Sequence, residues 1–313
     1  MYKKKHITVV IPAYNEEKLM RSVIDTMPAS VDAVIIVDDA STDATRDRIA
    51  DADDARVSLV RHETNRGAGA AVASGYRRFL ESDSDIAVVM NGDAQMDPGD
   101  MEPLLDAVIE EGADYAKGNR LFTGEAWAMI PKVRYFGNSF LSFLTKIASG
   151  YWHAADSQTG YTAVTREMLE QIPLDRLYPD YGYPNHMLVL LNIAGARVKD
   201  VPVRPVYNVG ETSGIRLHRV IPRLSWLLVK SFFYRMAAKY VIRDFHPLVL
   251  FYAAGIFLFL LDIPLVLRLV YLLCAEGRIF KANFQTVILV TIMAVQFTLF
   301  AMWFDMDYNK GLK

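Results

Sequence analysis

The chain has 313 residues, of which 52% are hydrophobic and 22% are charged, and its formal net charge is −2. This balance excludes a disordered chain, a collagen-like repeat and a strongly basic nucleic-acid-binding protein, while the length allows one or two domains. Because Cys274 is the single cysteine, an intrachain disulfide and a four-cysteine zinc site are excluded as well.

Short apolar runs alternate with stretches of helical character over the first third of the sequence. The apolar runs are residues 7–12, 33–37, 57–61 and 86–90, and the helical stretches are residues 18–26, 42–50, 68–80 and 100–111. Apolar strands that alternate with helices are typical of a parallel sheet with both faces covered. The sequence therefore predicts an α/β fold with a ligand site at the carboxyl ends of its strands.

Polar clusters follow three of these strands, at the edge where the ligand site is expected. They are Tyr14-Asn15-Glu16, Asp38-Asp39 and Asn91-Gly92-Asp93. A carboxylate at the position of Asp39 can accept hydrogen bonds from the N–H groups of a nucleobase. Gly67-Ala68-Gly69 follows the third strand but is only part of a dinucleotide-binding fingerprint, so we interpret it as a tight strand-to-helix turn.

The segment from Asn91 to Gln95 is a candidate metal site. Asp93 ends an apolar strand among small residues and can reach a divalent ion. Mg²⁺ and Mn²⁺ prefer oxygen ligands and take few of them from the protein, the rest coming from phosphate and water. The alternative is an Asx-type turn ahead of a helix that starts at Pro98, and the segment alone does not decide between the two.

Three arginines are candidates for phosphate contacts: Arg120, Arg134 and Arg216. The guanidinium group grips phosphate with a rigid fork of donors. Each of these arginines taken singly is better explained as a solvated surface charge.

The C-terminal part of the chain is far less polar than the rest. Residues 247–304 hold five charged side chains, whereas residues 1–246 hold 61. Residues 284–304 carry no charge over 21 positions, enough for a helix to cross a membrane. Residues 247–274 form a second candidate span, interrupted by Asp262, Pro264 and Arg268. We expect a two-helix transmembrane hairpin; the alternative is a pair of buried helices in a soluble domain.

Basic residues near the spans predict the orientation of this hairpin. Six lie beside its ends, namely Lys230, Arg235, Lys239, Arg243, Lys310 and Lys313, against three near its connector, namely Arg268, Arg278 and Lys281. The excess favours a polar domain on the cytoplasmic face. The apolar run at residues 7–12 is also too short for the hydrophobic region of a signal peptide.

Residues 217–245, ahead of the hairpin, mix aromatic and aliphatic side chains with basic ones. Arg235, Lys239 and Arg243 are spaced four apart and so share one helix face. We expect this basic face to lie on an anionic membrane surface. The alternative is an ordinary helix that faces the core and has one solvated side.

Taken together, several segments resemble the family 2 glycosyltransferases with a GT-A fold, and above all the membrane-anchored dolichyl- or polyprenyl-phosphate sugar synthases. The resemblance spans residues 7–216. Its motifs are Val9-Val10-Ile11-Pro12-Ala13-Tyr14-Asn15-Glu16-Glu17, Val37-Asp38-Asp39-Ala40-Ser41-Thr42-Asp43, Asn65-Arg66-Gly67, Asn91-Gly92-Asp93-Ala94-Gln95, Gly118-Asn119-Arg120, Asp156-Ser157-Gln158-Thr159-Gly160-Tyr161, Val201-Pro202-Val203 and Gly210-Glu211-Thr212-Ser213-Gly214-Ile215-Arg216.

The resemblance implies a division of the chain and a set of site residues. It implies a GT-A, Rossmann-like catalytic domain over residues 1–216, amphipathic interfacial helices over 217–246, a hairpin over 247–304 with spans at 247–274 and 284–304, and a cytoplasmic tail over 305–313. The residues it implies for the donor nucleotide are Pro12, Tyr14, Asn15, Glu16, Asp39, Asn91, Gly92 and Arg216. Asp93 and Gln95 would hold Mg²⁺ or Mn²⁺, and the catalytic residues would be Asp93, Arg120, Arg134 and Asp156.

The implied reaction transfers a hexose from a nucleoside-diphosphate sugar to dolichyl or polyprenyl phosphate, with inversion. The metal and Arg216 would stabilise the leaving diphosphate. A lipid monophosphate is largely dianionic at neutral pH and needs no general base, only cations such as Arg120 and Arg134 to place it. The sequence departs from the family pattern in two places: Asn91 replaces an aspartate of the metal motif, and no acidic residue stands near Asn185-His186.

Two other functions remain open at this point. One is a membrane glycosyltransferase that acts on a saccharide or glycolipid hydroxyl, for which Asp156 is the candidate general base. The other is a non-catalytic membrane scaffold of the same fold, which Asn91 keeps open. GDP-mannose, UDP-glucose and UDP-N-acetylglucosamine all remain candidate donors, and we expect the lipid bilayer as a partner but no nucleic acid. The oligomeric state, including a homo-oligomer, stays open.

Overall fold

The computed structural model describes residues 1–121, 132–206 and 217–313, without the side chains of residues 132–136, 138 and 217–219. The chain divides into two compact units, one of Met1–Phe232 with Gly311–Lys313 and one of Phe233–Lys310. Arg216 lies outside the described residues, and of Arg134 only the backbone is described.

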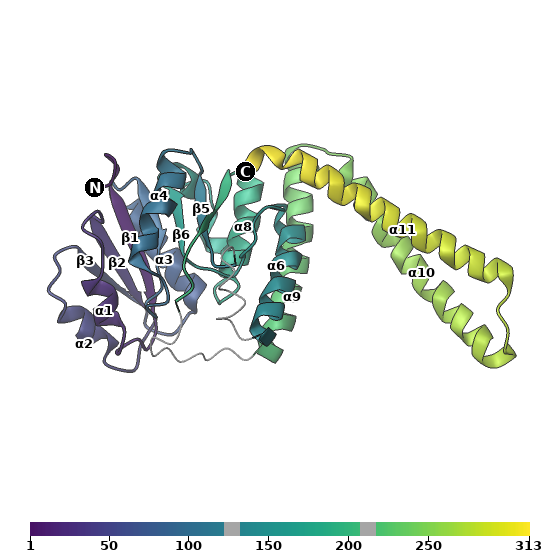
Figure 1. The fold of residues 1–313 in the computed structure, drawn as a ribbon, viewed down its shortest axis with the longest axis horizontal. Helices are drawn as coiled ribbons and strands as arrows, with labels where there is room; N and C mark the ends of the chain where they lie inside the picture. The colour runs from purple at the N-terminus through teal and green to yellow at the C-terminus, as the bar shows by residue number, and fades with distance from the viewer. Residues whose placement is uncertain (122–131, 207–216) are drawn as a thin grey trace. The chain divides into compact units, whose positions relative to one another are not determined.

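The first unit is built on one mixed sheet (Figure 1). Within the described residues the strands are β1 (Ile7–Ala13), β2 (Ala33–Asp38), β3 (Val57–Arg61), β4 (Ile86–Val89), β5 (Tyr115–Asn119), β6 (Thr162–Thr165) and β7 (Val198–Pro202). Their order is β3-β2-β1-β4-β6-β5-β7. The four strands predicted from the sequence are confirmed and are mutually parallel. The sheet as a whole is not parallel, because β6 runs antiparallel to both β4 and β5.

Helices cover both faces of the sheet, as predicted. The helices in this part of the described chain are α1 (Met20–Asp25), α2 (Thr45–Ala50), α3 (Ala68–Leu80), α4 (Met101–Ile109), α6 (Lys132–Ser149), α7 (Arg166–Leu169), α8 (Tyr183–Ala194) and α9 (Leu217–Ala237), with 3₁₀ turns at Pro98–Asp100 and Leu174–Arg176, and α9 lies on other helices and not on the sheet. Val9 and Ile11 of β1 share a buried cluster with α1 and α4. Val10, which points the other way, packs against Gly75 of α3.

The last helix of this unit packs on its neighbours through small and aliphatic side chains. Leu228 of α9 lies in a buried cluster with Ala148 of α6 and Val189 of α8. Leu224 of α9 packs against Gly182, and a Cβ atom on Gly182 would stand 2.4 Å from the Leu224 side chain. The α9 helix is therefore part of the packed domain over much of its length.

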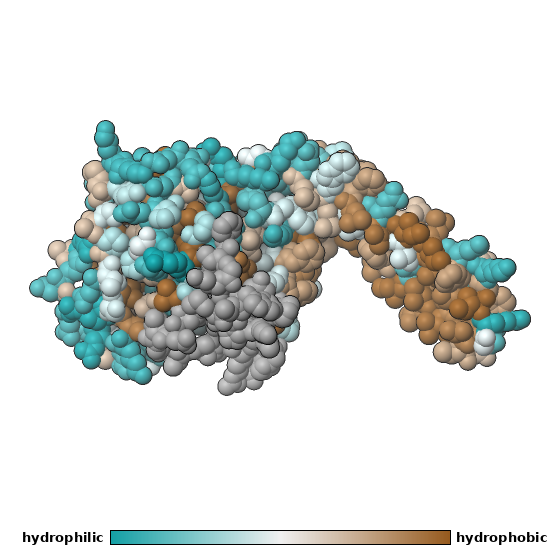
Figure 2. Space-filling model, in the orientation of Figure 1, coloured by the Kyte–Doolittle hydropathy of each residue, from teal (hydrophilic) through white to brown (hydrophobic). Residues whose placement is uncertain are grey.

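The second unit contains the predicted hairpin. It holds the end of α9, a π-helical turn (Ala238–Arg243), α10 (Leu248–Glu276) and α11 (Lys281–Tyr308). The two long helices lie side by side, and their surface is largely hydrophobic (Figures 1 and 2). Both are long and apolar enough to cross a membrane, and little of their most apolar stretches is buried. That exposure disfavours the alternative of two core helices in a soluble domain.

The hairpin is held together by close helix–helix contacts and by a polar contact between Thr291 and Asp262. Thr298 of α11 approaches Gly255 of α10 so closely that a Cβ atom there would stand 2.5 Å from its Oγ1 atom. The Thr291 hydroxyl donates to the Asp262 carboxylate over 2.7 Å. Asp262, which interrupts the first span in the sequence, is thus turned toward the partner helix, while Arg268 is exposed.

The expectation that Arg235, Lys239 and Arg243 form a basic face on a membrane surface is wrong for two of the three residues. Arg235 is fully buried and Lys239 is buried as well, whereas Arg243 is exposed. Arg235 pairs with Asp305 of α11 and Lys239 donates to the side chain of Asn309. The exposed residues of this segment are mainly apolar, including Trp226, Val229, Phe233, Val241 and Ile242.

Candidate active site

The polar clusters predicted from the sequence do meet at one edge of the sheet. β1 pairs with β2 on one side and with β4 on the other, and all three strands run parallel. Their carboxyl ends therefore lie next to one another, followed by Tyr14, Asp39 and Asn91. This is the edge at which open α/β sheets bind ligands.

The loop after β1 is fastened to the loop after β2 by hydrogen bonds. The Asn15 N–H donates to Ser41 Oγ over 3.0 Å, and the Asn15 side-chain oxygen accepts from the Thr42 N–H over 2.8 Å. The Glu16 N–H donates to Thr45 Oγ1 over 2.7 Å. Asn15, with a φ of 58°, thus serves to shape the loop, while Tyr14 stands 45% exposed beside it.

Asp39 is buried and its carboxylate binds three N–H donors. Oδ1 accepts from His62 Nδ1 over 2.6 Å and from the Arg66 N–H over 2.9 Å, while Oδ2 accepts from the Gly67 N–H over 2.7 Å. His62 Nε2 in turn lies 2.9 Å from Ser74 Oγ of α3. His62 and Ser74 were not expected from the sequence, because nothing in their spacing to Asp39 indicates that β3 and α3 bring them there.

The turn that holds Asp39 depends on glycine. Gly67 has a φ of 93°, and a Cβ atom there would stand 2.5 Å from the Pro179 carbonyl oxygen. The Ala70 N–H donates to that same carbonyl over 2.9 Å. The sequence interpretation of Gly67-Ala68-Gly69 as a tight strand-to-helix turn is therefore confirmed, and the turn also packs the 178–183 segment against the site.

Asp93 and Glu16 form an acidic pair at the same edge. Burial, together with the negative charges of Asp93 and Asp43, raises the pKa of Glu16 to about 7. Asp93 Oδ1 accepts from the Gln95 N–H over 3.1 Å, so the turn interpretation of this segment also holds. Gly92 lies against the loop after β1, since a Cβ atom there would be in ordinary contact with the Pro12 carbonyl oxygen at 3.4 Å and with Glu16 Cγ at 3.5 Å.

The donor set fits a hard divalent cation. In the part of the chain that the structure describes, no group of three or more His, Cys, Asp or Glu side chains could hold a metal by itself. Mg²⁺ commonly takes only one or two protein carboxylates and completes its shell with substrate phosphates and water. Asp93, with Glu16 beside it and Gln95 in the same turn, offers that kind of partial oxygen site.

Arg120 and Asp156 form a two-point ion pair next to this edge. Arg120 Nε and Nη2 lie 2.8 and 3.2 Å from the two carboxylate oxygens of Asp156. Burial would raise the pKa of Asp156, but the attraction of the Arg120 guanidinium outweighs it and lowers that pKa. The Asp156 side chain is 1% exposed and that of Arg120 22% exposed. Arg120 is thus the member of the pair that solvent or a ligand can reach.

A buried ionic cluster that the sequence did not predict lies beside the Arg120–Asp156 pair. Lys117 of β5 is fully buried and donates to the Thr159 carbonyl, and burial lowers its pKa to about 8. Asp200 of β7 accepts from Asn119 Nδ2 over 3.0 Å and from the Ala155 N–H over 2.7 Å, and burial raises its pKa to about 6. The cluster ties the ends of β5 and β7 to the loop that carries Asp156.

Asn185 and His186, where the sequence lacks an acidic residue, make internal contacts. Asn185 is buried and donates to Thr145 Oγ1 over 2.7 Å and to Ser157 Oγ over 3.0 Å. His186 Nδ1 accepts from the Tyr178 N–H over 3.2 Å. Both residues therefore hold the segments around the site rather than standing open to a ligand.

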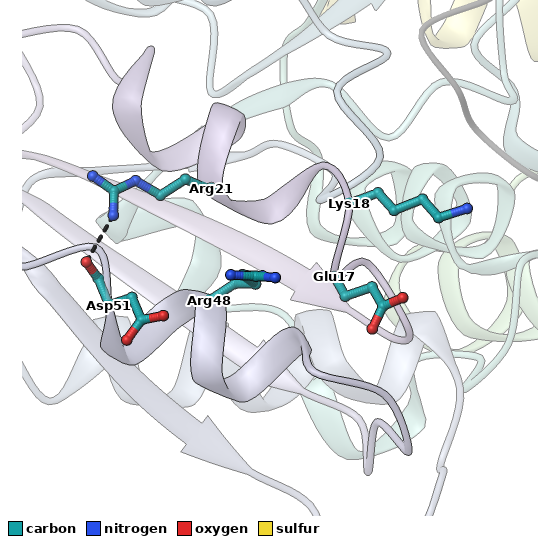
Figure 3. Close-up of a pocket in the computed structure, with 5 residues that line it drawn as sticks. All are labelled: Glu17, Lys18, Arg21, Arg48 and Asp51. Carbon is teal, nitrogen blue, oxygen red and sulfur yellow. Dashed lines mark hydrogen bonds between the residues drawn. The ribbon is translucent and has the colours of Figure 1, made fainter.

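A separate cleft of about 430 Å³ lies between α1 and α2, lined by Glu17, Lys18, Arg21, Arg48 and Asp51 (Figure 3). Arg21 donates to the Asp51 carbonyl over 2.7 Å and pairs with Asp25 of its own helix. The cleft contains none of the site residues expected from the sequence.

Comparisons with known proteins agree with this geometry. The family model described as Glycosyl transferase family 2 matches residues 8–173, more than half of the chain. Over 219 residues the chain is 28% identical to the UDP-N-acetylglucosamine–dolichyl-phosphate N-acetylglucosaminyltransferase of Methanococcus voltae, covering 65% of this chain and 87% of that relative. Over 205 residues it is 31% identical to the undecaprenyl-phosphate mannosyltransferase of Micrococcus luteus, covering 63% and 82%.

The fold also matches a solved glycosyltransferase. Glucosyl-3-phosphoglycerate synthase from Mycobacterium tuberculosis, crystallised with Mn²⁺, UDP and glucosyl-3-phosphoglycerate, superposes with a TM-score of 0.57 at 22% identity, over 74% of this chain and 80% of that one. The predicted GT-A fold is confirmed, and the chain belongs to glycosyl transferase family 2.

Proposed function

We propose that this protein transfers a hexose from a nucleoside-diphosphate sugar to dolichyl or polyprenyl phosphate, with inversion at the anomeric carbon, at the surface of a membrane. The two relatives described above are both transferases named for a lipid-phosphate acceptor. The apolar hairpin supports an acceptor that resides in a bilayer, because a soluble acceptor would not require one.

The observation that carries the proposal is the Arg120–Asp156 pair. A hydroxyl acceptor requires a general base within reach of its proton. Asp156, the candidate for that role, is engaged at both oxygens by Arg120, whose positive charge lowers the pKa of Asp156 and so weakens it as a base. A phosphate acceptor is already ionised and requires a cation instead, and Arg120 is the accessible partner of the pair.

In the proposed reaction a phosphate oxygen of the lipid attacks the anomeric carbon while the bond from that carbon to the nucleoside diphosphate breaks. Arg120 would orient the acceptor phosphate, with Arg134 of the first turn of α6 as its expected second cation. Arg216 would stabilise the diphosphate as it leaves with an additional negative charge. The side chain of Arg134 and the whole of Arg216 lie outside the described residues, so their roles rest on the sequence.

For the donor, we propose that Asp39 accepts a hydrogen bond from the nucleobase and that Pro12, Tyr14, Asn15, Glu16, Asn91 and Gly92 line the nucleotide site. Asp93 and Gln95 would hold Mg²⁺ or Mn²⁺. When bound, that ion would supply electrostatic stabilisation of the diphosphate leaving group. Asn91 then leaves the site with one negative charge fewer than the usual motif, and the neighbouring Glu16 offers a carboxylate in partial compensation.

We further propose that the hairpin spans the membrane and that the catalytic unit faces the cytoplasm. The excess of basic residues beside the hairpin ends supports this orientation. The burial of Arg235 and Lys239 in the folded protein does not change this orientation argument. The positive-inside rule counts basic residues near the spans while the chain inserts into the membrane, before it folds.

The test is a transfer assay with the full chain in membranes. A panel of nucleoside-diphosphate hexoses would be combined with polyprenyl phosphate or with neutral polyprenol, with and without a chelator, and lipid products identified by mass. We expect a polyprenyl-phosphate hexose that forms only in the presence of a divalent ion. A product on polyprenol, with none on the phosphate, would overturn the proposal.

A further inference from the structure

The hydrogen bonds around Asp39 limit what its carboxylate can still accept. An ionised carboxylate is an acceptor only and offers about four lone-pair positions, two on each oxygen. Among the residues that the structure describes, Asp39 binds three donors, two on Oδ1 and one on Oδ2. One position therefore remains, and it lies on Oδ2.

The two positions on Oδ1 are firmly occupied. Because ionised Asp39 cannot donate, His62 Nδ1 must carry the proton of their 2.6 Å contact. In a neutral ring Nε2 is then the acceptor, and the Ser74 hydroxyl 2.9 Å away can donate to it. Ser74 and Asp39 thus fix the orientation of the His62 ring from both sides. The other donor to Oδ1 is the backbone N–H of Arg66.

We infer that the donor nucleotide carries uracil and not guanine, because Asp39 retains room for one hydrogen bond only. The inference rests on the proposed function, in which Asp39 contacts the base. Uracil presents a single N3–H group between two carbonyl oxygens. Guanine presents two parallel donors, N1–H and N2–H, which match a carboxylate with a position open on each oxygen.

This mismatch would weaken the binding of a guanine nucleotide. With Oδ1 filled, one of the two guanine donors would lose its water without gaining an acceptor, which is the expensive case for a buried polar group. Cytosine and adenine lack a ring N–H at this edge. Each would donate from its exocyclic amine only and would set a ring nitrogen lone pair beside the negatively charged carboxylate, whereas the uracil N3–H is flanked by carbonyl groups. Arg66, whose backbone holds Asp39, has an exposed side chain that can donate to a uracil carbonyl.

The inference is tested by nucleotide binding to the full chain in detergent micelles. Calorimetric titrations with UDP, GDP and 3-methyl-UDP, each with Mn²⁺, compare the three bases under the same conditions. We expect UDP to bind at least about tenfold more tightly than GDP, since tenfold corresponds to about one hydrogen bond. We also expect at least about a tenfold loss with 3-methyl-UDP, which lacks the N3–H donor. Equal or tighter binding of GDP, or unchanged binding of 3-methyl-UDP, would overturn the inference.

A variant tests the cause of the selectivity. His62→Ala removes one donor from Asp39 Oδ1 and should narrow the ratio of GDP to UDP dissociation constants by several-fold. Glu63→Ala, at the exposed neighbouring position, should leave that ratio unchanged. A ratio that does not change in folded His62→Ala contradicts the lone-pair argument. If that variant does not fold, the three titrations of the unaltered protein still test whether the site prefers uracil.

The transfer assay separates this inference from the proposed function. Formation of lipid-phosphate hexose from a GDP-sugar more efficiently than from any UDP-sugar would overturn the uracil assignment and leave the proposed function standing. Absence of binding by both UDP and GDP would overturn both.

Discussion

Arg235 and Asp305 form a two-point ion pair with both side chains fully buried, although they stand seventy positions apart in the sequence. Arg235 Nη1 and Nη2 lie 2.8 and 2.9 Å from the two carboxylate oxygens of Asp305. The Tyr240 hydroxyl donates to Asp305 Oδ1 over 2.6 Å, and Asn309 donates to Tyr240 over 2.8 Å. The pair thus fastens the end of α9 and the π-helical turn to the last turns of α11.

Removal of one partner should destabilise the second unit strongly. Arg235→Ala would leave the Asp305 carboxylate buried without its counter-charge, which typically costs about 3–5 kcal/mol. The measurement is the free energy of unfolding in detergent. Arg278→Ala, at an exposed pair with Glu276, should cost no more than about 1 kcal/mol. The double variant Arg235→Met with Asp305→Leu should recover much of the loss, and a double variant as unstable as the single one would contradict this account.

These residues show what the sequence could and could not predict. The spacing of Arg235, Lys239 and Arg243 predicts one helix face, but the π-helical turn at Ala238–Arg243 leaves Arg243 exposed while the other two are buried. Periodicity also does not say whether a helix face meets water or a carboxylate far along the chain. β1 to β4 were predictable because they are apolar runs. β5 and β7 were not, because each carries an ionic residue of the Lys117–Asp200 cluster, and that cluster forms only when strands 83 residues apart become neighbours.

The candidate site was likewise predictable from the sequence only in part. Its motifs and their order were visible in the sequence, because the polar residues directly follow apolar strands. The partners of Asp39 were not, because His62 and Ser74 reach it through the pairing of β2 with β3 and the packing of α3. A single sequence gives residue types at strand ends but does not give the contacts between loops.

Gly67 should be intolerant of any side chain. Gly67→Ala would combine a φ of 93° with a Cβ atom 2.5 Å from the Pro179 carbonyl oxygen. Gly195→Ala is the matched control, because its φ is 85° and a Cβ atom there meets nothing within 4 Å. Strain alone should cost the control about 1–2 kcal/mol, and Gly67→Ala should lose clearly more unfolding free energy. Because the Gly67 N–H binds Asp39, affinity for UDP should fall as well in this variant only.

Asp93 should be required for both metal binding and turnover. Asp93→Ala removes the carboxylate of the proposed metal site and should lower kcat by about 10²–10³-fold, the usual effect of losing one group that stabilises a developing charge. Mn²⁺ binding in the presence of UDP, followed by electron paramagnetic resonance, should weaken in parallel. Asp97→Ala, a nearby acidic residue that pairs with Arg204, is the control and should retain Mn²⁺ binding. Full turnover of Asp93→Ala would refute the metal assignment.

His186 should make the protein more sensitive to acid. Burial lowers the pKa of His186 to about 4, below its usual 6.5. Between these two pH values the unfolded chain binds a proton that the folded chain does not, so stability rises with pH across this window and is lost on acidification. His186→Gln removes this contribution, and its unfolding free energy should therefore fall less steeply than that of the unaltered protein from pH 6.5 to pH 4.5. Parallel pH curves for the two proteins would show that His186 does not titrate in this way.

The Asp156→Asn variant distinguishes a hydroxyl acceptor, which needs a general base, from a phosphate acceptor, which does not. If Asp156 were the general base, Asp156→Asn would lower kcat by about 10²–10⁴-fold and leave acceptor binding intact. In the proposed reaction its task is to hold Arg120, so Asp156→Asn should act mainly on the KM for polyprenyl phosphate, and kcat should fall by less than about tenfold.

The matched variant is Arg120→Lys, which keeps the charge but loses the two-point contact with Asp156. It should raise the same KM by about tenfold or more, because an ammonium group cannot reproduce the bidentate geometry. Steady-state kinetics with varied polyprenyl phosphate at saturating donor measures both variants. A large loss of kcat in Asp156→Asn with an unchanged KM would establish Asp156 as a base and point to a hydroxyl acceptor.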